Sequence, residues 1–140
     1  MNTEKPNESM NTEKPNERNN LGKIWKPNFG LEEYKIEFKK QFPDLANRIE
    51  IEDEVHFITG MLAESARNAI FTNDPEKLRR ILFFVDEIIT RNKIENIDSE
   101  IINSFQISFV TKNEIENSEC GESLLNEISG DLKSIIEIAI

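Results

Sequence analysis

The sequence lacks the features that mark several large classes of protein. It contains one cysteine, so it forms no intrachain disulfide, and it has no apolar run near the roughly 18 residues that a membrane-spanning helix needs. Glycine and proline number five each, which is few for an all-β domain with many turns. The first residues also lack the apolar stretch of a secretory signal, so we expect a cytoplasmic protein in a reducing compartment.

Basic residues are scarce relative to acidic ones. The chain has 17 Lys and Arg against 27 Asp and Glu, a formal net charge of −10 over 140 residues. Affinity for nucleic-acid phosphates and for anionic lipids comes largely from Lys and Arg, so we expect binding to neither. The length suits one hydrophobic core, and a charged fraction of 31% is typical of a helical domain with solvated faces.

The N-terminus contains a tandem copy of nine residues. Residues 1–9 and 10–18 differ only at Ser9 and Arg18, and methionine is their only apolar residue type. Nothing in these copies can be buried to offset the entropy lost on ordering. We therefore expect residues 1–20 to be a disordered tail and residues 21–140 to form a single helical domain.

Apolar residues in the rest of the chain recur at spacings of three and four, the period of an amphipathic helix. The pattern predicts an all-α fold of five or six amphipathic helices. We expect these segments at residues 31–42, 43–51, 53–72, 75–90, 98–110 and 121–140. Their packing is left open between an up-and-down stack and a short array of α-hairpins.

Two aspartates are placed to cap helices. Asp74 precedes Pro75, whose missing N–H costs nothing in a first turn, and this is the clearest helix start in the chain. Asp44 is similarly expected to cap the short segment after Pro43. Phe83 and Phe84 widen the apolar face of the helix that follows Asp74, which predicts a central position with neighbours on two sides.

Three local features leave choices open. Gly130 interrupts the last helix, so either a neighbour approaches closely there or the helix divides in two. Residues 105–110 are rich in aromatic and β-branched side chains, so a strand is the alternative there. Trp25 and Phe29 lie in a stretch punctuated by proline and glycine, where aromatic side chains typically cap a core.

Groups that could perform catalysis are few. His56 is the only histidine, and the preceding Glu52, Asp53 and Glu54 match no zinc or calcium ligand spacing. Cys120 precedes an expected helix start but has no histidine partner, so we expect a surface or half-buried thiol. No glycine-rich phosphate loop occurs. We therefore expect no enzyme, no cofactor and no metal site.

The acidic excess is unevenly distributed. Residues 1–50 contain nine basic and nine acidic side chains, whereas residues 51–140 contain eight basic and eighteen acidic ones. A negative surface can steer a basic protein partner, although acidic residues at helix N-termini also favour the helix dipole. Two clusters at expected helix ends are the candidate partner-binding residues: Glu50, Glu52, Asp53 and Glu54, and Glu114, Glu116, Glu119 and Glu122.

Four short motifs resemble a group of small, acidic, helical bacterial proteins. They are FPDL at 42–45, GML at 60–62, LRRILFFVD at 78–86 and ISFV at 107–110. The resemblance covers about residues 31–140 and implies a helical architecture without catalytic residues. Some members of this group look like immunity proteins encoded beside secreted toxins. Where the group has an acidic residue after its last motif, this chain has Thr111 and Lys112.

The charge map and the resemblance together predict a non-enzymatic protein-binding module. The first hypothesis is an immunity protein that neutralises a cognate bacterial toxin with a basic surface, such as a nuclease, because a nuclease presents Lys and Arg to its substrate. The alternative is a helical-repeat scaffold for other cytoplasmic proteins, which predicts a large exposed apolar groove instead of an acidic face. A hydrolase that acts through a glutamate and His56 is a third hypothesis.

Overall fold

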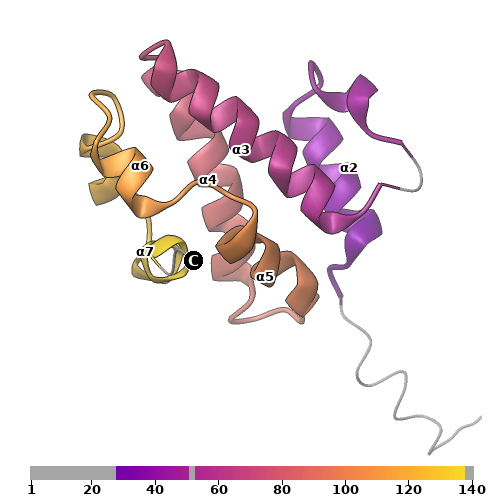
Figure 1. Cartoon of the computed structure of the whole chain (residues 1–140). Helices are drawn as coiled ribbons and strands as arrows, with labels where there is room; N and C mark the ends of the chain where they lie inside the picture. The colour runs from indigo at the N-terminus through magenta and orange to yellow at the C-terminus, as the bar shows by residue number, and fades with distance from the viewer. Residues whose placement is uncertain (1–27, 51–52, 138–140) are drawn as a thin grey trace, which may run out of the picture.

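The computed structural model describes residues 28–50 and 53–137, and Figure 1 shows helices joined by loops in this part of the chain. The predicted all-α class is confirmed, and no strand occurs in this part of the chain. The expected disordered tail, Trp25 and Glu52 lie outside the described residues. The elements are α2 (Leu31–Gln41), the 3₁₀ helix η2 (Ala46–Arg48), α3 (Val55–Phe71), α4 (Pro75–Arg91), α5 (Ser99–Ile107), α6 (Lys112–Glu116), the 3₁₀ helix η3 (Ser123–Glu127) and α7 (Gly130–Glu137).

Helix α4 occupies the centre of the fold, as predicted from its wide apolar face. It packs against α3 on one side and α7 on the other. Phe84 is buried, and its ring meets that of Phe42 edge to face with centroids 5.2 Å apart. Phe83, one residue earlier, is 40% exposed, so only one of the two phenylalanines serves the core.

The contacts between helices resolve the choice between a closed stack and a linear array. In a linear array each unit touches only its neighbours in sequence. Here α7 contacts both α4 and α5, which precede it by several elements, while α3 contacts α4 and α5. Figure 1 shows α3 crossing in front of α4, with α5, α6 and α7 grouped on one side. The helices therefore enclose one common core.

A chain of hydroxyl groups crosses this core. The hydroxyl oxygens of Tyr34 and Thr59 lie 2.6 Å apart, and those of Thr59 and Ser104 lie 2.7 Å apart. Ser104 Oγ donates to the carbonyl oxygen of Ile101 at 2.7 Å, which ends the chain. All three hydroxyl side chains are fully buried, so each needs a partner inside the protein. Burial raises the pKa of the Tyr34 phenol. These hydrogen-bonded hydroxyl groups fix α2, α3 and α5 relative to one another.

The predicted caps are confirmed at one aspartate and wrong at the other. Asp74 accepts a hydrogen bond from the backbone N–H of Lys77 at 3.2 Å, and Pro75 begins α4. Asp44 caps nothing, because η2 begins after Leu45 and no side chain bonds to its first turn. A single 3₁₀ turn closed by backbone bonds is all that forms after Pro43, so no α-helical N-terminus is present to be capped.

The C-terminal third differs most from the predicted pattern. Residues 121–140 do not form one helix: η3 and α7 are separate, and α7 begins at Gly130. A methyl group at Gly130 would meet no atom within 4 Å, so the chain divides there without any close neighbour. Helix α6 was not predicted. Residues 105–107 belong to α5, so the alternative strand over 105–110 does not form.

Phe29 confirms the expected role of an aromatic cap on the core. It is buried, forms an isolated bridge with Ile97, and lies under the guanidinium of Arg91, 4.7 Å from its ring centroid. This contact closes the end of the core between α2 and the connection from α4 to α5.

Candidate functional site

The first acidic cluster surrounds the start of α3. Asp53 accepts a hydrogen bond from the backbone N–H of Glu50 at 2.7 Å, which closes a tight turn before the helix. Glu54 is the N-cap residue of α3, but its side chain makes no capping bond and is exposed. Glu50 is exposed as well. Two carboxylates of this cluster, those of Glu50 and Glu54, therefore face solvent, and Glu52 lies outside the described residues.

Glu114 of the second cluster is held by the protein itself. Arg67 of α3 donates from Nε to Glu114 Oε1 at 2.7 Å and from Nη2 to Oε2 at 3.2 Å. Oε2 also accepts from the backbone N–H of Thr111 at 2.9 Å, while the Thr111 hydroxyl caps the N–H of Glu114. The hydrogen bond from Arg67 is the main reason that the pKa of Glu114 is lowered. This carboxylate ties α6 to α3.

The other three glutamates of the second cluster are presented to solvent. Glu116, Glu119 and Glu122 are exposed. Between Glu119 and Glu122 the chain turns inward: Cys120 is only 8% exposed, and its thiol lies 3.9 Å from the carbonyl oxygen of Ala69. The expected surface or half-buried thiol is therefore wrong. Burying Cys120 anchors this turn beside the end of α3 and directs the neighbouring carboxylates outward.

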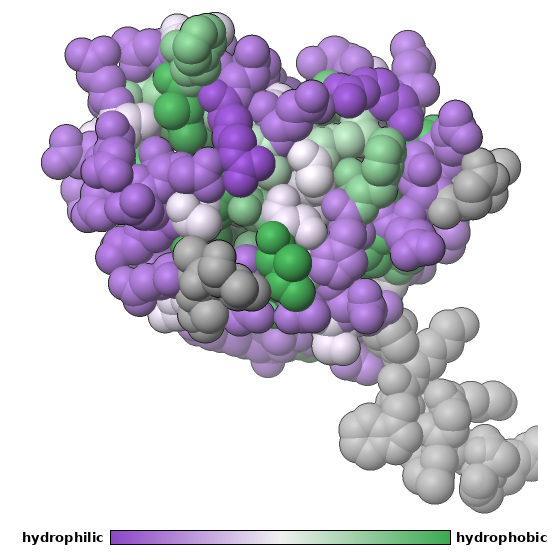
Figure 2. Space-filling view, in the orientation of Figure 1, coloured by the Kyte–Doolittle hydropathy of each residue, from purple (hydrophilic) through white to green (hydrophobic). Residues whose placement is uncertain are grey.

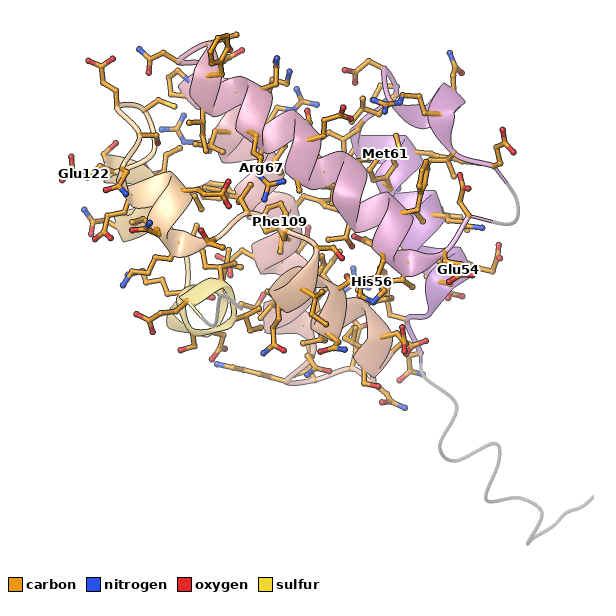
Figure 3. The ribbon with its side chains drawn as sticks, in the orientation of Figure 1. Glu54, His56, Met61, Arg67, Phe109 and Glu122 are labelled. Atoms are coloured by element: carbon orange, nitrogen blue, oxygen red, sulfur yellow. The ribbon has the colours of Figure 1, made fainter. Side chains whose placement is uncertain are left out.

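The two acidic clusters do not merge into one patch. Figure 3 shows Glu54 and Glu122 on opposite sides of the molecule, with Met61 and Arg67 of α3 between them. Helix α3 has 17 residues. At about 1.5 Å per residue it separates the clusters by roughly 25 Å. The clusters therefore flank the two ends of α3.

The outward face of α3 carries residues that sequence reasoning missed. Phe57, Gly60, Glu64, Arg67 and Phe71 follow spacings of three and four, so they share one face of the helix. Phe57 is 49% exposed and Phe71 is 88% exposed. In the first turn of α3 it is Ile58, the residue after Phe57, that packs in the core, and it is fully buried. Figure 2 shows separate groups of apolar side chains on this face, with hydrophilic side chains between and around them.

His56 links α3 to the end of α5. Its Nδ1 lies 2.7 Å from the hydroxyl oxygen of Ser108, the C-cap residue of α5. Its Nε2 lies 3.9 Å from Glu100 Oε1, which is longer than the 3.2 Å limit of a typical hydrogen bond. A serine nucleophile needs a histidine whose other nitrogen is held by a carboxylate. This geometry lacks that second bond and instead joins two helices.

Ion pairs use most of the basic side chains near the acidic ones. Seven carboxylates of the described residues pair with a Lys or Arg at distances between 2.7 and 3.3 Å, in pairs such as Arg48 with Glu64 and Lys112 with Glu137. Within the described residues, Glu54, Glu119 and Glu122 take part in no such pair. Both ends of α3 therefore carry exposed carboxylates that these ion pairs do not neutralise.

Within residues 28–50 and 53–137, no three metal-binding side chains come together, and no helix is both long and apolar enough to cross a bilayer. Comparisons with protein-family models, with curated proteins and with solved structures find no match to this chain.

Proposed function

We propose that this protein is a non-enzymatic binding module, an immunity protein that neutralises a cognate bacterial toxin with a basic surface. The observation that carries the proposal is the exposed pair Glu119 and Glu122, which flank the buried Cys120 and form no ion pair with any residue that the structure describes. A toxin that acts on nucleic acid presents Lys and Arg, and an acidic inhibitor complements that surface.

Rigid presentation favours this use of the turn. Gly121 is buried, and Ser118 Oγ donates to the carbonyl oxygen of Ile115 at 2.7 Å, which closes the turn on itself. A fixed turn removes the entropic cost of ordering the backbone when a partner binds, so only the Glu side chains have to be ordered. Charges of this kind mainly raise the association rate and exclude wrong partners.

The first experiment is a titration of the full chain against the product of the neighbouring gene, with growth of cells that express this product as the second readout. The proposal predicts tight binding and protection. Absence of both would refute it.

A second experiment separates steering from general acidity. The double variant Glu119→Lys/Glu122→Lys should slow association by about tenfold or more and flatten its dependence on salt. The matched control Glu32→Lys/Asp44→Lys changes the net charge equally at exposed carboxylates near α2 and should have a small effect. Equal slowing in both variants would show that only the net charge matters.

A further inference from the structure

Gly60 is an unexpected residue for the middle of α3. A glycine inside a helix destabilises it by about 1 kcal/mol relative to alanine. A methyl group at Gly60 would meet no atom within 4 Å, so no neighbour inside the protein requires the missing side chain. Gly60 therefore leaves bare backbone open to a partner from outside, and such close approach is a recurrent use of glycine.

Apolar side chains border this bare stretch of helix. Phe57 lies one turn before Gly60 and is 49% exposed, and Ile107 at the end of α5 is 54% exposed. The bond between His56 and Ser108 brings together the positions next to these two residues. We name Phe57, Gly60 and Ile107 the Gly60 patch.

Three carboxylates border the Gly60 patch, and the two arginines near it, Arg48 and Arg67, are each paired with a glutamate. Glu54 is exposed one turn before Phe57, Glu100 stands beside His56 with 66% of its side chain exposed, and Glu64 is exposed one turn after Gly60. Glu64 is paired with Arg48, and Glu54 has no basic partner among the described residues. An apolar centre with an acidic margin fits an occupant that is apolar in the middle and basic at its edges.

We infer that the Gly60 patch docks a basic amphipathic α-helix of the partner protein, which crosses α3 at Gly60. This inference rests on the proposed function and names the chemistry of the contact. Helices pack with axes about 8–10 Å apart, and the smallest separations need small side chains at the crossing point. Phe57 and Ile107 then contact the apolar face of the incoming helix, while its Lys or Arg residues meet Glu54 and Glu100.

A second copy of this chain is a poorer occupant. Two Gly60 patches face to face would bring the acidic margins of two molecules together, each with a net charge of −10. Like charges opposed across an interface disfavour association.

The test uses the amide NMR spectrum of the full chain and three synthetic peptides. The probe is a Leu/Lys peptide of about five helical turns, with leucines at spacings of three and four so that they share one face. The second peptide has the same composition with the leucines scattered around the helix. The third replaces every lysine with glutamate. We expect only the probe to shift the amides of residues around Gly60.

The decisive variant is Gly60→Gln, which fills the open space and favours the helix. It should keep or raise the midpoint of thermal unfolding, and it should weaken binding of the probe peptide by about tenfold or more. Gly130→Gln changes the other glycine with open space among those that the structure describes; it is the matched control and should bind the probe as the parent does. Phe57→Ser and Ile107→Ser should also weaken the probe, whereas Ile94→Ser, which alters a side chain 85% exposed beyond α4, should not.

Several results would overturn the inference. Unchanged affinity in Gly60→Gln, equal binding of the scattered peptide, or shifts confined to other surfaces would each do so. A dimer in sedimentation that Gly60→Gln dissociates would show that a second copy covers the patch. If the neighbouring gene's product binds Gly60→Gln as tightly as it binds the parent, the proposed function is supported and the role of the Gly60 patch as its docking site is refuted. If that product binds neither the parent nor Gly60→Gln but the probe binds at Gly60, the proposed function is refuted and the patch is shown to dock a basic amphipathic helix of some other protein.

Discussion

Asp86 of α4 fixes the start of α7 through Ser129. The Asp86 carboxylate accepts hydrogen bonds from the backbone N–H of Ser129 at 3.0 Å and from its hydroxyl at 2.5 Å. Ser129 Oγ in turn accepts from the backbone N–H of Leu132 at 3.1 Å, the bond of a helix N-cap. One carboxylate on the central helix therefore decides where the last helix begins.

Asp86→Ala should lower the free energy of unfolding by about 1–3 kcal/mol, because it removes two hydrogen bonds and frees the capping residue. Urea unfolding followed by far-ultraviolet circular dichroism measures the change. Asp44→Ala is the control, since Asp44 is exposed and caps nothing, and it should change stability by no more than about 0.5 kcal/mol. Equal losses in the two variants would contradict the assignment.

The buried hydroxyl chain predicts an order of stabilities. Tyr34→Phe removes only the end of the chain, so it should destabilise by about 1 kcal/mol. Thr59→Val removes the middle and strands the hydroxyl of Tyr34 without a partner, so it should destabilise by about 2–3 kcal/mol. Urea midpoints of the two variants and of the double variant measure this. A larger loss in Tyr34→Phe than in Thr59→Val would show that the hydroxyl groups are not coupled as described.

The helical class and the main helices could be predicted because their cues are local. The apolar period of α4 and the Asp74-Pro75 start both lie within a few residues of the structure that they determine. The division at Gly130 could not be decided in the same way. It depends on Asp86, which is more than forty residues away and holds Ser129 in place as the new cap.

The eight candidate acidic residues were chosen by charge, and charge does not distinguish paired from free carboxylates. Glu114 resembles Glu119 in sequence, yet Glu114 has Arg67 as its partner from a distant helix. The sequence did contain a signal that Glu114 has a structural role: Thr111 and Glu114 have the spacing of a capping box. Nothing local indicated that Phe57 and Phe71 would be left exposed, since their period matches that of the core.

Glu114 should make stability depend on pH. Its pKa is lowered from the usual 4.5, so the stabilising effect is present above that value and is lost as the pH falls through the folded-state pKa. The stability difference between the parent protein and Glu114→Gln should be about 1 kcal/mol at neutral pH and shrink below about pH 4.5. Urea unfolding across a pH series measures it. Glu119→Gln removes an exposed carboxylate that has no ion-pair partner among the described residues, so its stability difference from the parent should be small and vary little with pH. A parallel trend in both variants would rule out the link to Arg67.

Alanine substitutions at Gly60 and Gly121 should change the free energy of unfolding in opposite directions. Gly60→Ala adds a methyl group to open space in a helix interior, so it should stabilise the protein by about 0.5–1 kcal/mol. At Gly121 the same methyl group would lie 2.5 Å from the carbonyl oxygen of Ile115, which belongs to the backbone and cannot rotate away. Gly121→Ala should therefore destabilise by about 1–3 kcal/mol as the turn is forced open. Thermal unfolding measures both, and stabilisation by Gly121→Ala would contradict the tight turn that directs Glu119 and Glu122 outward.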